Sequence, residues 1–278
     1  MKFDLDTAWK DAMHLLRESF GLLTVIAGIF YFLPYLAAML WVPGLAELSN
    51  GQFEPGSDQV NAMANEMLAG YWWALLLVAI LQSIGFLAML SLLRRRVRPT
   101  VGQALEQGAK SMPTYLIATF LFILGMLLVG LLLISISAAT GLGALAFGIA
   151  ALVFVAFVYL FVKFSLLGPV IAMNEERNPV RALLGSWHLT KGSSLRLFFF
   201  YALLFIAYFV IAAVVSLLFT LVFALGGAEA QEFGQAFSSS LMNALAAVIF
   251  TCVLAAVYRQ CVRLRTSSEV PTINPDDD

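Results

Sequence analysis

The sequence has few charged residues: Asp, Glu, Lys and Arg make up 12% of its 278 residues, whereas 61% are hydrophobic. Soluble domains carry about 25% charged residues, so this chain lacks the polar surface that a water-exposed fold needs. Several apolar runs exceed the ~18–20 residues needed to cross a bilayer core of about 30 Å. We therefore expect one membrane domain over residues 1–268, followed by a short, acidic, disordered tail over 269–278.

The sequence also has no excess of basic residues, and it has few cysteines and histidines. The net charge of −1 gives no reason to expect a nucleic acid partner. Cys252 and Cys261 lie about 13 Å apart along one predicted helix, which is too far for a disulfide between them. His14 and His188 are isolated, and the sequence contains no metal-ligand cluster and no catalytic motif. We therefore expect no metal, no cofactor and no enzymatic activity.

Six apolar segments predict six transmembrane helices. They cover residues 21–42, 71–93, 113–137, 144–173, 197–225 and 238–258. Pro113 is predicted to lie in the first turn of the third span, and Gly168-Pro169 to break the fourth span near its end. Open sheets cannot span lipid, and these runs lack the alternation of barrel strands. The predicted fold class is therefore all-α, a polytopic membrane helical bundle.

One set of connecting loops lacks Lys and Arg altogether. These loops cover 43–70, 138–143 and 226–237. The N-terminus and the loops on the other side hold every basic residue except Lys163; these loops cover 94–112, 174–196 and 259–278. We call the side of the membrane that carries the second group the basic side. Short basic loops stay in the cytoplasm, so both termini are predicted to be cytoplasmic.

A short amphipathic segment precedes each odd-numbered span on the basic side. Apolar residues recur in these segments at i, i+3 and i+4, which places them on one helix face. Their start signals are Asp4 or Asp6, then Thr100, then Asn178 followed by Pro179. We expect three interfacial helices in the headgroup layer. The chain then has three units of interfacial helix, span, outer loop and span, a possible threefold hairpin repeat.

Residues 163–192 carry the most specific pattern, KFSLLGPVIAMNEERNPVRALLGSWHLTKG. This segment, together with Ala8-Trp9 near the N-terminus, resembles the YciC-like bacterial inner-membrane proteins and the related membrane domain of glycerophosphoryl diester phosphodiesterases. The resemblance implies a multi-pass protein of the bacterial cytoplasmic membrane. The phosphodiesterase activity of some relatives belongs to a separate soluble domain, which we do not expect in this chain.

The same segment supplies the first candidate site. Lys163 either lies near the midplane and lines a cavity, which favours a functional site, or it snorkels to the inner headgroups if the helix ends early. Lipid phosphate is a plausible counter-ion in both cases, because no span interior carries an acid. Ser186, Trp187 and Lys191 are candidate lipid or ligand contacts; the alternative is that they position and end a headgroup-level helix.

Two further groups of polar residues are candidates. A basic cluster follows the second span, and it either fixes topology or binds anionic headgroups; its members are Arg94, Arg95, Arg96 and Arg98. Gln82 and Asn243 lie inside spans, where interhelical hydrogen bonds are the common use of amides and a transport path is the alternative.

Three functions remain open from the sequence. The first is a non-catalytic protein of envelope maintenance that binds membrane lipids, including anionic headgroups, or a membrane-protein partner. The second is a transporter or channel for a small amphipathic solute. The third, which depends on the family resemblance alone, is a phosphodiesterase-related lipid enzyme embedded in the membrane.

Overall fold

A computed structural model describes residues 3–49, 57–94, 99–140 and 143–269, and secondary structure in these ranges is entirely helical. The α-helices are α1 (Leu5–Ala27), α2 (Leu33–Trp41), α3 (Leu45–Ser49), α4 (Asp58–Leu92), α5 (Val101–Thr140), α6 (Gly143–Phe164), α7 (Leu167–Asn174), α8 (Pro179–Thr190), α9 (Ser194–Phe223) and α10 (Ala228–Glu269). A π-helical turn, η1 (Gly28–Phe32), joins α1 to α2, and a 3-10 turn, η2 (Ala224–Gly226), follows α9.

Six of these stretches are long and apolar enough to cross a membrane, which confirms the predicted fold class. Of the predicted tail 269–278, residues 270–278 lie outside the described residues, and Glu269 is the last residue of α10. The two cysteines are free and buried.

The fourth span is split earlier than predicted. α6 ends at Phe164 and α7 begins at Leu167, so the break precedes Gly168-Pro169 rather than coinciding with it. Pro169 lies in the first turn of α7, where its missing N–H costs no helical hydrogen bond.

The three predicted interfacial helices differ from one another in how they join their spans. Only the third, α8, stands alone. The first two are the opening turns of α1 and α5, which continue directly into their spans. Thr100 and Gln103 form a reciprocal capping box with distances of 3.3 and 3.1 Å, which starts α5 well before its apolar run. Pro113 consequently lies inside α5, not in a first turn as predicted.

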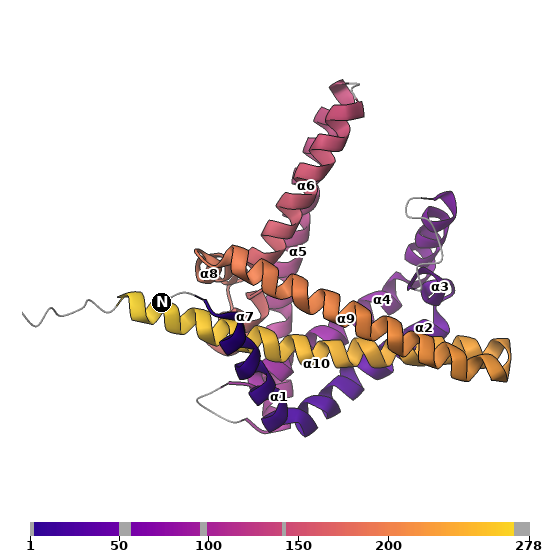
Figure 1. The fold of residues 1–278 in the computed structure, drawn as a ribbon, viewed down its shortest axis with the longest axis horizontal. Coiled ribbons are helices and arrows are strands. Elements are labelled where there is room, and N and C mark those ends of the chain that lie inside the picture. Colours follow the sequence, from indigo (N-terminus) through magenta and orange to yellow (C-terminus); the bar gives the residue numbers. More distant parts are fainter. Residues whose placement is uncertain (1–2, 50–56, 95–98, 141–142, 270–278) are drawn as a thin grey trace, which may run out of the picture.

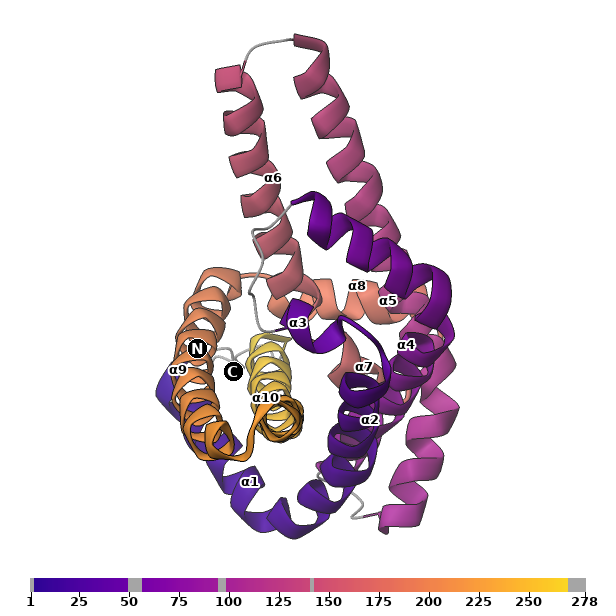
Figure 2. The same cartoon turned by 90° about the vertical axis from the view of Figure 1, so that its right-hand side faces the viewer.

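α10 lies at the centre of the fold. It runs through the middle of the molecule beside α9, and α1 packs along it (Figure 1). α4 packs mainly along α5, as α1 does along α10. Each of these two pairs joins helices of two different predicted hairpins. The α5–α6 hairpin projects away from the α9–α10 pair in both views (Figures 1 and 2). The outer part of this hairpin and most of α9 present exposed apolar side chains, as expected of lipid-facing helices.

Small residues allow the helices of the core to approach closely. A Cβ atom at Gly108 of α5 would lie 2.8 Å from the Ile84 carbonyl oxygen of α4. A Cβ at Gly168 of α7 would overlap the Phe86 ring of α4. Lipid offers apolar side chains as good an environment as the protein does, so close backbone packing is a main source of helix association in membranes.

The N-terminal residues are anchored to the core on the basic side. Phe3 is buried, and its ring lies 6.4 Å from that of Phe200. Its carbonyl accepts a hydrogen bond from Arg196 at 3.0 Å, and the Asp4 carbonyl accepts one from Gln260 at 3.1 Å. These contacts bring the start of α1 against α9 and α10.

We predict that Gly108→Ala destabilises the protein by about 1–3 kcal/mol, because the added methyl group meets the backbone of α4 and forces the helices apart. Gly102→Ala is the matched control in the same helix, since its Cβ would meet no atom within 4 Å. The control should leave stability unchanged or raise it by up to about 1 kcal/mol through helix propensity. Reversible unfolding by detergent titration in bicelles measures both, and equal stability of the two variants would contradict this packing.

Candidate functional site

Lys163 lies in the last turn of α6, immediately before the break that leads to α7. Its side chain is buried, with only 3% of its surface exposed. The ammonium lies 5.1 Å from the centre of the Trp187 ring of α8 and 5.5 Å from that of Tyr159, one helical turn earlier in α6. The early helix end therefore places Lys163 at the basic end of α6, enclosed by aromatic rings.

The backbone at Lys163 is held by hydroxyl groups of α8. The last carbonyls of a helix have no intrahelical partner, and the Lys163 carbonyl belongs to this group. Ser186 Oγ donates to it at 2.8 Å, and Thr190 Oγ1 lies 3.3 Å away. Both hydroxyl-bearing residues are fully buried. α8 thus caps α6 from the side and fixes the position of Lys163.

Trp187 and Lys191 complete this arrangement. The Trp187 ring contacts Phe164 at 5.7 Å and Tyr159 at 6.2 Å, so it packs against α6 on the face that carries Lys163. Lys191 is the C-cap of α8 and is exposed, and Gly192 follows with a φ of 88°. Asn178 caps the start of α8, accepting hydrogen bonds from the backbone of Val180 and Arg181.

A groove of about 690 Å³ opens between α6 and the start of α9, with Lys163 at one end. Its polar end is formed by Lys163, Lys191 and Ser194. Its walls are apolar side chains of α6 and α9, namely Phe154, Val155, Val158, Val162, Leu195 and Phe198. We call it the Lys163 groove. One cationic end and two apolar walls make it amphipathic along its length.

Lys163 contributes a positive charge to the polar end of the groove. No carboxylate forms an ion pair with its ammonium in the ranges that the structure describes. Lys191 and Arg265 add like charge nearby. A desolvated cation–π contact contributes about 2 kcal/mol, but the aromatic rings carry no net negative charge. An anion in the groove would supply the opposite charge.

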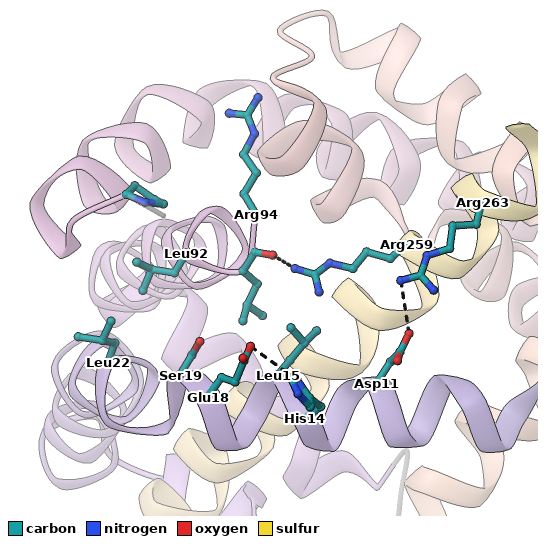
Figure 3. A pocket seen from close by; sticks show the side chains of 12 residues that line it. Asp11, His14, Leu15, Glu18, Ser19, Leu22, Leu92, Arg94, Arg259 and Arg263 are labelled. Atoms are coloured by element: carbon teal, nitrogen blue, oxygen red, sulfur yellow. Dashed lines mark hydrogen bonds and ion pairs between the residues drawn. The ribbon is translucent and has the colours of Figure 1, made fainter. Parts of the chain in front are cut away.

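Arg94 lies in a second polar region, on the basic side. A cavity of about 490 Å³ is bounded there by α1, the end of α4 and α10. Figure 3 shows Arg94 extending away from Arg259, and its guanidinium pairs with Glu175, which ends α7 in a left-handed conformation. Arg94 thus links α4 to the α7–α8 turn. Arg95, Arg96 and Arg98 lie outside the described residues.

The arginines of α10 in this cavity also join helices. Arg259 reaches the end of α4 and donates to the Leu93 carbonyl, and Arg263 pairs with Asp11 of α1 at 3.8 Å (Figure 3). A cation at a helix C-terminus is favoured by the helix dipole. These contacts give the cavity a structural role in joining α1, α4 and α10.

The two intramembrane amides singled out from the sequence meet in the structure. Gln82 of α4 and Asn243 of α10 line one cavity of about 460 Å³. Tyr31 of η1 and Tyr115 of α5 line it as well. These residues belong to helices that are far apart in the sequence. Their spacing along the chain therefore could not predict that they lie together.

Sequence reasoning missed several members of the Lys163 groove. Tyr159 precedes Lys163 by four residues and so shares its helix face, a signal that could have been found. Thr190 and Ser194 had no such signal, because their roles depend on how α8 and α9 fold against α6. The apolar residues of the groove walls could not be distinguished by sequence from the many similar residues of the spans.

The fold and these cavities define a polytopic helical membrane protein with an amphipathic groove that begins at a buried lysine. A family model described as a domain of unknown function, DUF7847, matches residues 6–261. The chain therefore belongs to the DUF7847 family. No curated protein and no solved structure matches it.

We predict that Ser186→Ala alone costs about 1 kcal/mol of stability, because Thr190 can turn its hydroxyl to the Lys163 carbonyl. Adding Thr190→Val leaves that carbonyl unpaired, so the double variant should lose at least about 0.5 kcal/mol more than the sum of the single changes. Thr220→Val, whose hydroxyl bonds only its own helix at 2.9 Å, is the control. Detergent-titration unfolding measures all four variants; strict additivity would contradict the shared cap.

Proposed function

We propose that this protein is a non-catalytic membrane protein that binds an anionic lipid in the Lys163 groove. The observation that carries the proposal is the buried Lys163 ammonium, which has aromatic rings but no described carboxylate around it. A lipid phosphate would bring the opposite charge to this end of the groove. Lys191 and Ser194 line the same end and would add a second cation and a hydroxyl.

The length and direction of the groove support a lipid rather than free phosphate. The apolar wall of α6 runs from Phe154 to Val162 and then reaches Lys163. Nine residues of helix cover about 13 Å, close to half of a hydrocarbon core of about 30 Å. A lipid of one leaflet would therefore place its headgroup at Lys163 and its acyl chains along α6 and α9.

Orientation agrees with this choice of ligand. We infer that the basic side faces the cytoplasm, since the short loops there carry the Lys and Arg residues. Anionic lipids give the cytoplasmic leaflet its negative potential, so the charged end of the groove would face the leaflet that supplies its ligand. The resemblance of residues 163–192 to YciC-like proteins further supports a bacterial inner-membrane location and a role in envelope maintenance.

The non-catalytic part of the proposal rests on the chemistry of the groove. Lys163, Lys191 and Ser194 can bind an anion, but no acid or histidine is among the described residues that line the groove, so none of these can activate water or hold a metal there. The described residues likewise contain no cluster of three or more potential metal ligands. These features favour binding over a phosphodiesterase-related lipid enzyme.

A transporter of a small amphipathic solute is the second candidate. The cavity that joins Gln82 to Asn243 is the specific observation in its favour. That cavity and the Lys163 groove share no lining residue, and a transport path would require a connection from one side to the other. Solute-dependent flux into proteoliposomes that is abolished by Gln82→Leu would favour this candidate.

Native mass spectrometry of the purified full chain tests the proposal. We predict that phosphatidylglycerol is retained at least about tenfold more than phosphatidylcholine, a difference of about 1.4 kcal/mol. Lys163→Met should lose this preference, because it keeps the length of the side chain but not its charge. Lys163→Arg should keep most of it.

Lys110→Met is the matched control, since Lys110 is exposed and pairs with Glu106 at 2.5 Å outside the groove. Inorganic phosphate added as a competitor distinguishes the two sources of the anion: displacement of the lipid at millimolar phosphate would favour a free-anion site. Equal phosphatidylglycerol retention by the Lys163→Met and Lys110→Met variants, both folded by thermal unfolding, would refute the proposal.

A further inference from the structure

The cavity of about 460 Å³ that holds Gln82 and Asn243 has a chemistry of its own. Four elements surround it: η1, α4, α5 and α10. Hydrogen-bonding side chains come from each of them, and they are Tyr31, Gln82, Ser83, Tyr115, Thr119, Asn243 and Thr251. Such a concentration is unusual inside spans that are otherwise almost wholly apolar, because polar groups in hydrocarbon must find partners.

Some of these groups already have partners in their own helices. Ser83 Oγ donates to the Ala79 carbonyl at 2.7 Å, and Thr251 Oγ1 donates to the Ala247 carbonyl at 2.6 Å. Their hydrogens are therefore used, and each oxygen can only accept further bonds. These hydroxyls make the cavity more polar, but they do not donate a hydrogen bond to a ligand.

The amide of Asn243 is different. Its Nδ2 atom is buried and has no hydrogen-bond partner in the described structure. An amide nitrogen carries two hydrogens and can only donate. Gln82 adds a second amide, and the Tyr31 hydroxyl can donate as well. Tyr115 shares a side-chain hydrogen bond with Thr119. The Asn243 amide is therefore a donor without an acceptor oxygen at the wall of this cavity.

The ligand that meets this need is uncharged and has an apolar part. In the part of the chain that the structure describes, no Lys, Arg, His, Asp or Glu lines the cavity, so an ionic group would enter without a counter-charge. Apolar side chains form the rest of the wall, namely Ala79, Phe86, Leu116, Ala246, Ala247 and Phe250. The volume falls within the range of small-molecule sites, roughly 300–1,000 Å³.

We propose that this cavity binds the uncharged, carbonyl-bearing head of a membrane amphiphile, whose carbonyl oxygens accept hydrogen bonds from Asn243 and Gln82. Ester carbonyls of a diacylglycerol and ring carbonyls of a quinone offer the same acceptor chemistry. This site is independent of the Lys163 groove, because the two share no residue and differ in charge.

Native mass spectrometry of the full chain tests the inference with three probes: 1,2-dioctanoylglycerol, its ether analogue 1,2-dioctylglycerol, which lacks both carbonyls, and a decyl-substituted benzoquinone. At least one carbonyl probe should be retained about tenfold more than the ether. The probe that is retained identifies the source of the carbonyl. Equal retention of ester, quinone and ether would overturn the inference, because the apolar walls alone would then explain binding.

Variants locate the site. Asn243→Leu and Gln82→Leu remove the amides at nearly constant volume, and each should reduce retention of the carbonyl probe about tenfold. Thr220→Val, in α9 and outside the lining of the cavity, should not. Lys163→Met should not either, so failure here and failure of the anionic-lipid proposal are distinguishable. Unchanged retention by both amide variants would overturn the assignment.

A measurement on the unaltered protein covers the case in which the amide variants fail to fold. Dioctanoylglycerol labelled with ¹³C at its carbonyls should show an infrared carbonyl band shifted to lower frequency when bound to the protein, relative to the same lipid dissolved in dry hydrocarbon, where its carbonyls have no donor. A band at the hydrocarbon frequency would show that the bound carbonyls accept no hydrogen bond, which contradicts the proposal.

Discussion

The hydrogen bonds that α8 makes to the Lys163 carbonyl organise this end of the molecule. They satisfy the end of α6 at the point where the helix breaks, and they hold α8 against α6. Trp187 is thereby placed beside the Lys163 ammonium, and the turn at Lys191-Gly192 directs α9 along the other side of the groove. A backbone requirement of helices in lipid thus positions a buried charge, an aromatic cradle and two apolar walls.

Much of the fold could be predicted from the sequence because it depends on local chemistry. The apolar runs define six spans, and Asp4, Thr100 and Asn178 act as the helix caps that their side chains favour. Helix pairing could not be predicted in the same way. All faces of α9 are apolar, so no periodicity tells which face meets protein and which meets lipid. The continuity of α5 through Pro113 likewise depends on the capping box upstream and on packing against α4.

The residues of the candidate sites could be predicted from the sequence, but their positions relative to one another could not. Lys163 stands out as the one basic residue within a span, yet its burial depends on an early break of α6 that Gly168-Pro169 only approximately indicated. Gln82 and Asn243 stand out for the same reason, but only the packing of α4 against α10 brings them to one cavity. In a membrane protein, rare polar residues mark where function is concentrated, whereas tertiary packing decides which of them act together.

The most direct test of the central claim is the proximity of the Lys163 ammonium to lipid phosphorus. Magic-angle-spinning NMR of the protein labelled with ¹⁵N at its lysine side chains, in bilayers that contain phosphatidylglycerol, measures ¹⁵Nζ–³¹P dipolar dephasing. The account predicts a dephasing component that disappears in Lys163→Met and persists in Lys110→Met. Dephasing that is the same in both variants would show that the groove holds no lipid phosphate at Lys163.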